Sequence, residues 1–433
     1  MSTPVTIELG PQGQDRRPDR ARLPVGRYAR LAAGALAVLM IAAAGGSAPP
    51  ARSPLVEVAI RPTSPFHLHT LAGDILYSVR MDPSPAVVTA YDLVDGAELW
   101  TTPLTGAVLD DSGGVVMEGV RVAGDRVLVS RGLSTVALDT ASGRVLWTAR
   151  HRVDGGGHGT GYSTEEVVLP GPGDPTVDGE QGEPVGQLGR VVRGIDLDTG
   201  AELWRSAPIR SYQPLDRTTG PLLLVVTVAG VIEVWDGHTG AVRARLVDGV
   251  RPAAMVPMTD GELVYIGADT TLTAYDVDTL TRRWRVPAPA RDGVGVPCGA
   301  QVCFVKDRRT WFLDAATGAA VGGPVSGGPP AVHAGHVVLY GNGGQGRVVD
   351  PHTGRILVDL TEWSMPVGSE FGTRPVLGRA TDEPRSWFAV LDPVVAAVRV
   401  LGSVPYRPAD CWASDTYITC QTGQEELRVW RYR

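Results

Sequence analysis

The sequence of 433 residues contains very little lysine or asparagine and lacks two common catalytic motifs. Lys306 is its only lysine and Asn342 its only asparagine, so nearly all of the positive charge is arginine. We attribute the scarcity of lysine to genome base composition rather than to function. Neither G-x-S-x-G nor H-E-x-x-H occurs, which excludes the nucleophile elbow of serine hydrolases and the helical zinc motif of metallopeptidases.

Amphipathic helices are also missing between Leu55 and Arg433. Apolar residues in this region alternate in short runs, and Gly-Asp or Asp-Gly pairs separate many of them. The 54 glycines and 34 prolines imply many turns, and the 43% hydrophobic and 20% charged residues are typical of a globular protein. Short alternating runs bounded by turn residues predict β-strands, so the expected fold class is all-β.

Charge is distributed unevenly along the chain. Residues 1–30 contain six arginines and three acidic residues, a net charge of +3, whereas the whole chain carries −7. The residues after position 30 therefore carry −10. Because an acidic domain repels a phosphate backbone, we expect no nucleic-acid partner.

The first 54 residues are typical of an export segment. Residues 1–30 lack apolar periodicity and are expected to form a disordered basic cytoplasmic tail. Residues 31–47 are uncharged and rich in alanine, and the preceding arginines predict a cytoplasmic N-terminus with the rest of the chain exported. The apolar core is shorter than the roughly 20 residues of a typical span. Both a transmembrane signal anchor and a cleaved signal peptide are therefore open, and the long leading region favours the anchor.

Residues 48–54 are rich in Pro, Ser and Ala, and are expected to form a spacer between the anchor and the exported domain. The predicted location is the cell membrane, with a single pass and an extracellular domain. If the segment is cleaved, the protein is secreted.

One hairpin pattern recurs eight times after the spacer. In RGIDLDTGAELW, a strand ends at Asp196, a turn contains Thr199 and Gly200, and a second strand ends at Trp204. Glycine supplies the positive φ of a tight turn, and Asp and Thr side chains bond turn backbone groups. Successive copies of the Asp lie 36 to 57 residues apart, and a period near 40 suits a four-stranded propeller blade. The repeat residues are Asp92, Trp100, Asp139, Trp147, Asp196, Trp204, Asp236, Asp276, Trp284, Asp314, Asp350 and Asp392, and the places without tryptophan hold Ala244, Gly322, Val358 and Val400.

The A-x-D-x-x-T-G-x-x-x-W pattern resembles the repeat of the pyrroloquinoline-quinone-type (PQQ-like) β-propellers, a family that contains quinoprotein alcohol dehydrogenases and non-enzymatic outer-membrane assembly scaffolds. The resemblance covers residues 55–433 and implies that each tryptophan packs between neighbouring blades. It implies a fold more specifically than a function, because the repeated residues are structural.

The predicted architecture is an eight-bladed propeller of four-stranded antiparallel blades, preceded by one transmembrane or signal-anchor helix. Residues 55–60 alternate as a strand without a blade of its own, while residues 410–432 supply only three strands. We expect the N-terminal strand to complete the C-terminal blade and close the ring. Eight hairpins and this composite blade would make nine, but the Asp392 copy lacks Thr-Gly and is not counted as a full blade. Counts of seven and nine stay open.

The longest interruption of the repeat is a Gly/Pro-rich acidic insertion at residues 149–190, for which disorder is the preferred description.

The four cysteines form two pairs, each of which flanks a turn between adjacent strands: Cys298 with Cys303, and Cys411 with Cys420. We therefore predict two local disulfides, consistent with export. Zinc is the rival interpretation, but neither pair has the C-x2-C spacing and no His pair lies nearby.

Several other residues have side chains that could act as ligands or catalysts. His67 and His69 share a strand face, His333 and His336 flank a turn, and the GGGHG run around His158 imitates a phosphate loop without the Lys-Ser or Lys-Thr that should follow. For each, a structural role is preferred to a ligand site. The same holds for His151 with Asp154, and for the acidic loop residues Asp174, Asp178, Glu180 and Glu183, whose spacing does not match an EF-hand.

The preferred function is an extracytoplasmic, membrane-anchored binding or protein-scaffolding module, with an unknown protein or small ligand on a propeller face and no assigned catalytic residue. A PQQ-dependent dehydrogenase with calcium is the first alternative. The resemblance to those enzymes would imply an amide ligand and, in many members, adjacent cysteines, whereas this chain has one asparagine and no adjacent Cys pair. An ectodomain ligand sensor is the second alternative.

Overall fold

The computed structural model describes most of the chain after the predicted spacer. The described residues are 54–63, 67–81, 85–105, 119–156, 158–169, 187–215, 217, 219–246, 258–268, 270–288, 294–327, 330–333, 336–340, 346–363, 376–380, 385–392, 396–422 and 425–432. The predicted tail and anchor lie outside these ranges, so the expectations for them stay predictions. Among the ranges given, no helix has the length and apolarity needed to cross a membrane.

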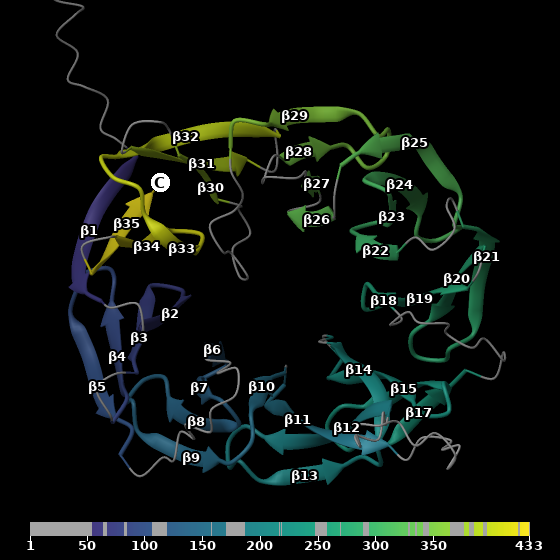
Figure 1. Ribbon diagram of the computed structural model, residues 1–433, viewed down its shortest axis with the longest axis horizontal. Helices are drawn as coiled ribbons and strands as arrows, with labels where there is room; N and C mark the ends of the chain where they lie inside the picture. Colours follow the sequence, from purple (N-terminus) through teal and green to yellow (C-terminus); the bar gives the residue numbers. More distant parts are fainter. Residues whose placement is uncertain are drawn as a thin grey trace, which may run out of the picture. The chain divides into compact units, whose positions relative to one another are not determined.

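Antiparallel four-stranded units follow one another along the chain (Figure 1). Blade 1 contains β2 (His67–Ala72), β3 (Ile75–Arg80), β4 (Val87–Asp92) and β5 (Glu98–Pro103). Blade 2 contains β6 (Gly119–Ala123), β7 (Arg126–Arg131), β8 (Ser134–Asp139) and β9 (Val145–Ala149). Blade 3 contains β10 (Val153–Gly155), β11 (Thr160–Leu169), β12 (Gln187–Asp196) and β13 (Glu202–Arg205). Blade 4 contains β14 (Ile209–Leu215), β15 (Leu222–Thr227), β16 (Ile232–Asp236) and β17 (Val242–Arg245).

The second half of the chain repeats this arrangement. Blade 5 contains β18 (Met258–Thr259), β19 (Leu263–Ala268), β20 (Thr271–Asp276) and β21 (Arg282–Pro287). Blade 6 contains β22 (Val294–Cys298), β23 (Gln301–Lys306), β24 (Arg309–Asp314) and β25 (Ala320–Ser326). Blade 7 contains β26 (Pro330–His333), β27 (His336–Tyr340), β28 (Gly346–Val349) and β29 (Ile356–Leu360). Blade 8 contains β30 (Val376–Ala380), β31 (Ser386–Asp392) and β32 (Ala397–Val404).

The first and last strands of the described chain form one sheet, which we call the closing blade. Its order is β33 (Ala409–Ala413), β34 (Tyr417–Thr422), β35 (Glu426–Tyr432) and β1 (Leu55–Pro62). β1 pairs antiparallel with β35 from Leu55 opposite Tyr432 to Pro62 opposite Glu426. This confirms the prediction that the N-terminal strand completes the C-terminal blade.

Burial explains why these residues form strands stacked face to face. The middle strands β15 and β8 are buried on both faces, whereas outer strands such as β13 and β17 are largely exposed. A continuous apolar strand is stable only where both sheet faces are covered. Each blade is therefore covered by its two neighbours, as in a propeller.

The described residues form nine blades, one more than the preferred eight and one of the counts that the sequence left open. Nine separate hydrophobic clusters each join two consecutive blades, including one between blade 8 and the closing blade and one between the closing blade and blade 1. Blades 3 and 4 appear as one eight-stranded sheet because Arg190 of β12 also pairs with Ile209 of β14. The Asp392 hairpin, discounted for its missing Thr-Gly, does form a blade, because β30 to β32 pair normally.

Tryptophan joins neighbouring blades at four of the seams. The indole N–H of Trp147 donates to the carbonyl oxygen of Leu197 at 2.8 Å, and the ring lies under Gly200 of the next blade. Trp100, Trp204 and Trp284 donate to Thr140, Gly237 and Ala315 in the same way, at 2.7 to 3.0 Å. This confirms the packing that the family resemblance implies.

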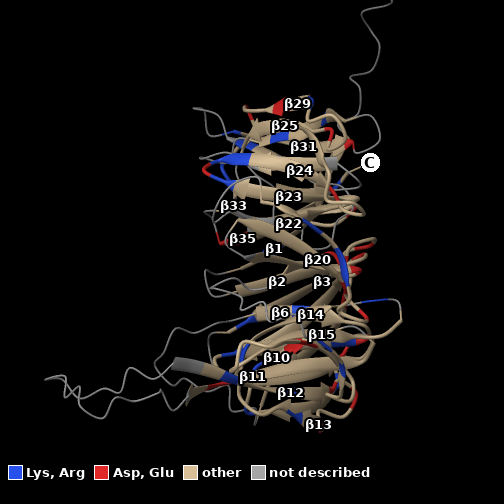
Figure 2. Cartoon of the chain, turned by 90° about the vertical axis from the view of Figure 1, so that its right-hand side faces the viewer, with Lys and Arg blue, Asp and Glu red and all other residues tan. Residues whose placement is uncertain are grey.

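The predicted insertion is narrower than residues 149–190. β10 and β11 lie within that interval and are the first two strands of blade 3, and β12 begins at Gln187. β11 and β12 pair over ten residues each, and Figure 2 shows β11 reaching to the left beyond the neighbouring strands. Residues 170–186 lie outside the described ranges.

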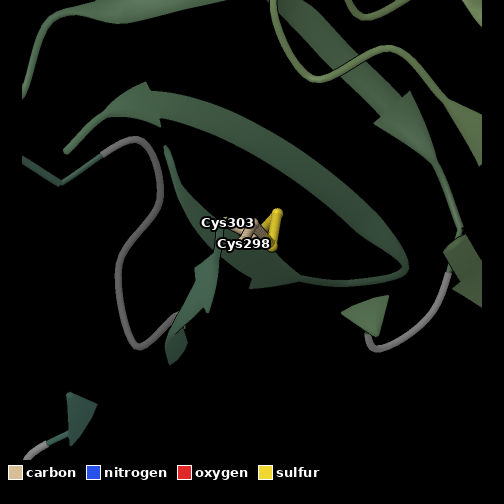
Figure 3. Close-up of a disulfide and its surroundings, with 2 residues drawn as sticks. All are labelled: Cys298 and Cys303. Carbon is tan, nitrogen blue, oxygen red and sulfur yellow. A yellow bond between two sulfur atoms is a disulfide. The ribbon is translucent and has the colours of Figure 1, made fainter. Parts of the chain in front are cut away.

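Both predicted disulfides are present. Cys298 of β22 is bonded to Cys303 of β23, as Figure 3 shows, and Cys411 of β33 is bonded to Cys420 of β34. Each joins the two inner strands of one blade, and the described residues include no free cysteine.

Candidate functional site

The repeated aspartates accept hydrogen bonds that organise the turns. Asp314 accepts hydrogen bonds from the backbone N–H of Thr317 at 2.8 Å and from its hydroxyl at 2.7 Å. The Thr317 hydroxyl lowers the pKa of the Asp314 carboxyl, although partial burial opposes the effect. Asp196, Asp236 and Asp276 accept equivalent bonds from Thr199, Thr239 and Thr279. The prediction that these carboxylates anchor turns is therefore consistent with their contacts.

In an antiparallel blade, the first and third turns fall on the same side of the sheet. We call this side of the ring the turn face. It carries the Asp-x-x-Thr-Gly turns, and acidic residues line it along the right-hand edge of Figure 2. The turn between the second and third strands lies on the opposite side, as does the extension of β11 and β12.

A cavity of about 440 Å³ lies on the turn face, where blades 2, 3 and 4 meet. We call it the turn-face cavity. Its walls are the β6–β7 turn of blade 2, the β10–β11 turn and Leu197 of blade 3, and the start and end of the β14–β15 connection in blade 4. The volume is within the range of small-molecule and peptide-anchor sites.

An ion pair between two blades fixes the rim of the cavity. The guanidinium of Arg126 in blade 2 contacts the carboxylate of Asp198 in blade 3 at 2.8 Å and that of Asp125 at 2.9 Å. The Arg126 side chain is only 14% exposed, whereas the Asp125 and Asp198 side chains are 78% and 68% exposed. The arginine is therefore held inside the rim, and its two acidic partners face outward.

The floor of the cavity is apolar. Leu197, Leu215 and the ring of Tyr162 are buried among the residues that line it, and Pro214 and Pro221 add apolar surface from blade 4. Leu215 belongs to the hydrophobic cluster between blades 4 and 5, and Leu197 to the cluster between blades 2 and 3. The floor is thus continuous with the packed seams.

Four residues of the GGGHG run, Gly155, Gly156, His158 and Gly159, line one wall of this cavity, and their residue types have a structural explanation. A Cβ atom on Gly156 would lie 2.4 Å from the carbonyl oxygen of Thr160, and one on Gly155 would lie 2.9 Å from Cβ of Ala123. Glycine is needed there for close packing. His158 has a φ of 57° and its Nε2 lies 2.6 Å from the carbonyl oxygen of Arg217, which ties the turn to blade 4.

His67 and His69 lie on β2, the inner strand of blade 1, with ring centroids 6.0 Å apart. Nε2 of His69 lies 3.2 Å from the Thr63 hydroxyl, and its ring packs edge-on against Trp412 of the closing blade. Burial, and secondarily the neighbouring His67, lower the pKa of His69 to about 3. Within the described ranges, no group of three His, Cys, Asp or Glu side chains is placed to hold a metal ion.

The remaining candidates do not converge on one place. The backbones of His333 and His336 lie opposite each other at the end of the β26–β27 pair. His151 precedes β10, and burial and the charge of Arg193 lower its pKa. Asp154 pairs with Arg152 at 3.2 Å. Asn342, Asp174, Asp178, Glu180 and Glu183 lie outside the described residues.

Sequence reasoning did not find the turn-face cavity. Its ion pair joins residues 72 positions apart, on turns of two different blades. Asp198 lies within the Asp-x-x-Thr-Gly turn, but at a position that the repeat leaves variable, and Arg126 belongs to no motif. The only signal was the glycine-rich run, which marked a close backbone approach without indicating what lay beside it.

Comparison with known proteins gives a family match over most of the chain. A family model described as outer membrane protein assembly factor BamB matches residues 52–185 and 188–319. No curated protein matches the sequence.

Several solved structures are among those that match the chain. BamB from Moraxella catarrhalis is 14% identical, with a TM-score of 0.43 over 88% of this chain and 98% of that one. The quinohemoprotein alcohol dehydrogenase from Comamonas testosteroni is 12% identical, with a TM-score of 0.41 over 88% of this chain and 76% of that one. The C-terminal WD40 domain of Sif2 is 12% identical, with a TM-score of 0.43 over 88% of this chain and 98% of that one.

Proposed function

Because this chain belongs to the PQQ-like β-propeller family whose model is described as outer membrane protein assembly factor BamB, we propose that it is a protein-binding scaffold. In this proposal the ring lies outside the cytoplasm, tethered to the membrane by residues 31–47, and it holds a partner protein against one of its faces. The family supports a protein partner in general. The tether and location rest on the charge and apolarity of the N-terminal residues.

The observation that carries the proposal is the arrangement of the polar side chains around the turn-face cavity and the partners that they contact. The carboxylates of Asp125 and Asp198 are both paired with Arg126, and the His158 ring lies against a backbone carbonyl. Both carboxylates stay exposed at the rim, above an apolar floor. A hollow with an apolar floor and a few polar groups at its rim favours binding.

Site-specific photocrosslinking in intact membranes tests the scaffold. A benzophenone amino acid would replace Val94 on the turn face, Leu133 on the opposite face, or Pro214 at the cavity, all of which are exposed. We expect a discrete protein adduct from at least one face, identified by mass spectrometry and absent without irradiation. If none of the three positions gives an adduct in membranes that contain the full chain, the scaffold proposal fails.

A second measurement separates the scaffold from the enzyme alternative. The full chain would be incubated with PQQ and calcium and assayed for dye-linked oxidation of alcohols and sugars. We expect no turnover. We also expect no rise in the melting temperature, which a ligand bound to the folded chain would cause. Turnover above that of a heat-denatured control would favour the dehydrogenase.

Protease treatment of intact cells tests the topology. We expect protease to remove the propeller while the basic tail remains protected. A propeller that stays intact until the cells are lysed would contradict the proposed location.

A further inference from the structure

We infer that a pair of side chains at each seam selects which blade docks against which, so that the repeated blades assemble in the right order. One member lies two places after the repeated Asp, on the turn between the third and fourth strands of a blade. The other is the first residue of the second strand in the preceding blade. We call the two together a seam pair, and Asp198 with Arg126 is an example. The inference concerns the assembly of the ring and does not depend on the proposed scaffold function.

The contacts that the repeat shares cannot choose between neighbours. At four seams an indole ring lies against the turn glycine of the following blade: Trp100 against Gly143, Trp147 against Gly200, Trp204 against Gly240, and Trp284 against Gly318. The ring and the turn are the same each time, so these contacts give no preference for the correct neighbour. Repeat proteins are prone to misassembly between their similar units. Selection therefore needs a position that differs from seam to seam.

The members of a seam pair occupy equivalent backbone positions in different blades. The first residue of the second strand lies opposite the repeated Asp of its own blade: Arg126 opposite Asp139, Thr160 opposite Asp196, and Gln301 opposite Asp314. In the following blade, the backbone N–H two places after the Asp donates to the Asp carboxylate, as it does at Asp198, His238 and Asp278. The backbone is thus alike at these seams, and the side chains of the pair are what differs.

At three of the seams the pair is polar and its members contact each other. The carboxylate of Asp198 in blade 3 lies 2.8 Å from the guanidinium of Arg126 in blade 2. In the other two pairs, Nδ1 of a histidine approaches a polar group of the preceding blade: His238 lies 3.1 Å from the Thr160 hydroxyl, and His352 lies 2.9 Å from the Gln301 amide nitrogen. An acid therefore meets a cation, and an imidazole meets a hydroxyl or an amide.

At three further seams both members of the pair are hydrophobic. Val94 of blade 1 follows Tyr417 of the closing blade, Ala141 of blade 2 follows Ile75 of blade 1, and Ala316 of blade 6 follows Leu263 of blade 5. A polar group set against an apolar partner would lose hydration without gaining a hydrogen bond. Polar members thus occur with polar members, and hydrophobic members with hydrophobic ones.

The seam between blades 4 and 5 reaches the same match by another route. The first residue of β15 is Leu222, which cannot bond the carboxylate of Asp278 in blade 5. Arg217, from the connection that precedes β15, lies 2.7 Å from that carboxylate, and its side chain is 19% exposed. The acid again meets a cation of the preceding blade. The chemistry of the pair is kept here although the strand position is not.

A wrong neighbour would leave a member of the pair without its match. If blade 4 docked on blade 2, His238 would replace Asp198 beside Arg126. The Arg126 side chain is only 14% exposed, so its charge would lose solvation without gaining a carboxylate. Leaving a polar group unmatched costs more than a matched contact contributes. The pair therefore acts mainly by excluding wrong neighbours.

Duplicating one pair tests the inference in the full chain. Arg126→Thr with Asp198→His gives the seam between blades 2 and 3 the pair of the next seam, so that each contact is matched but two seams are alike. Arg126→Lys with Asp198→Glu is the control, because it keeps the charges of the original pair. Each chain would be unfolded in urea in detergent micelles, with its disulfides intact, and refolded by dilution. Size-exclusion chromatography and limited proteolysis would give the fraction that returns as native monomer.

Stability and refolding should separate in the duplicated variant. We expect its urea midpoint to match that of the control, whereas Asp198→His alone should lower the midpoint because Arg126 loses its carboxylate. The refolding yield of the duplicated variant should fall at least about twofold below that of the control, because blade 4 can then dock on blade 2 as readily as on blade 3. An equal yield would show that the pair holds the seam without choosing the neighbour.

A second duplication ensures that the result does not depend on one seam. Gln301→Arg with His352→Asp copies the charged pair of blades 2 and 3 to the seam between blades 6 and 7. We again expect an unchanged urea midpoint and a refolding yield at least about twofold lower than that of the unsubstituted chain. Full yields from both duplicated variants would overturn the inference. Lowered midpoints in both would also overturn it, since the pairs would then not be interchangeable between seams.

Discussion

At the scale of the residue, the fifth position of the Asp turn shows how one backbone conformation is kept by different side chains. All eight residues four places after the repeated Asp have a positive φ, between 48° and 76°. Six are glycine, and the two exceptions are Leu280 and Ala396. Both exceptions follow a blade that lacks tryptophan at the docking place, which holds Ala244 and Val358. Glycine is therefore needed mainly where an indole must fit beneath the turn.

Gly200→Ala should destabilise the protein more than Gly230→Ala. Both glycines have a positive φ, of 72° and 79°, so both substitutions strain the backbone. A Cβ atom on Gly200 would lie 2.7 Å from the Trp147 ring, whereas one on Gly230 meets nothing within 4 Å. We expect the Gly200 variant to lose about 1 to 3 kcal/mol more in chemical denaturation. Equal losses would mean that the ring moves without cost.

His69 should make the stability of the ring sensitive to acid. Its pKa of about 3 in the folded protein lies below the ordinary value of 6.5, because burial disfavours the imidazolium. The unfolded chain binds a proton as the pH falls below about 6.5, but the folded chain does not, so stability falls between about pH 6.5 and pH 3. The loss should approach about 1.4 kcal/mol per pH unit from this group.

Thermal melts of His69→Gln test this prediction. The amide can still bond the Thr63 hydroxyl, and we expect the variant to lose less stability than the native protein between pH 7 and pH 4. His158→Gln, on the turn face, serves as the control. If His69→Gln has the same pH dependence as the control, the buried histidine is not the sensitive group.

At the scale of the element, the seams between blades differ in a way that the sequence alone suggested only partly. Four of the eight copies lack the tryptophan, including the one in blade 4, where Ala244 takes its place, and looser packing would be expected there. Leu280 instead fills the seam between blades 4 and 5, where it is buried in a cluster that includes Val234 and Ile266. Leu280, in place of the turn glycine, therefore fills space that Ala244, in place of the tryptophan, leaves within the same seam.

A double-mutant cycle at this seam should show strong coupling. Ala244→Trp alone would clash with Leu280, and Leu280→Gly alone would leave a cavity, so each should cost about 1 to 4 kcal/mol. Together they recreate the arrangement of Trp204 with Gly240, in which the indole lies under the glycine. We expect the double variant to be at least about 1 kcal/mol more stable than the sum of the single effects. Simple additivity would show that the positions do not share one space.

The strands and turns were largely predictable, because alternation and the Asp-x-x-Thr-Gly turn are local signals. The count of blades was not, since the Asp392 turn reaches the same backbone conformation through Ala396 rather than through glycine. The cavity was also beyond sequence reasoning. Arg126 and Asp198 approach each other only because two blades are stacked at a fixed angle, and nothing within either turn encodes that contact.

At the scale of the whole molecule, the closing blade joins the first and last strands of the described chain. Ala59 of β1 is 8% exposed and packs with Leu71 and Leu76 of blade 1, so it belongs to the seam that completes the ring. Ile60 is the next residue and points to the other side of the strand, where it is 43% exposed. The two positions allow closure to be tested with substitutions of the same type.

Ala59→Glu should open the ring, and Ile60→Glu should not. A carboxylate at residue 59 would be buried without a partner in an apolar seam, which costs several kcal/mol. We expect limited proteolysis to release fragments from the C-terminal blades of the Ala59 variant much faster than from the Ile60 variant. Identical digestion patterns would show that β1 is not required for closure.

The pairing of β1 with β35 also sets the order in which the protein can mature. Glu57 and Arg428, which meet across this pair, are 371 residues apart, so β1 leaves the ribosome long before its partner exists. At ordinary rates of synthesis, of about 5 to 20 residues per second, the strand waits roughly 20 seconds or more with its hydrogen-bonding edge unpaired. The first of the described strands to be made is therefore the last to be paired, and it is exposed to wrong partners for nearly the whole period of synthesis.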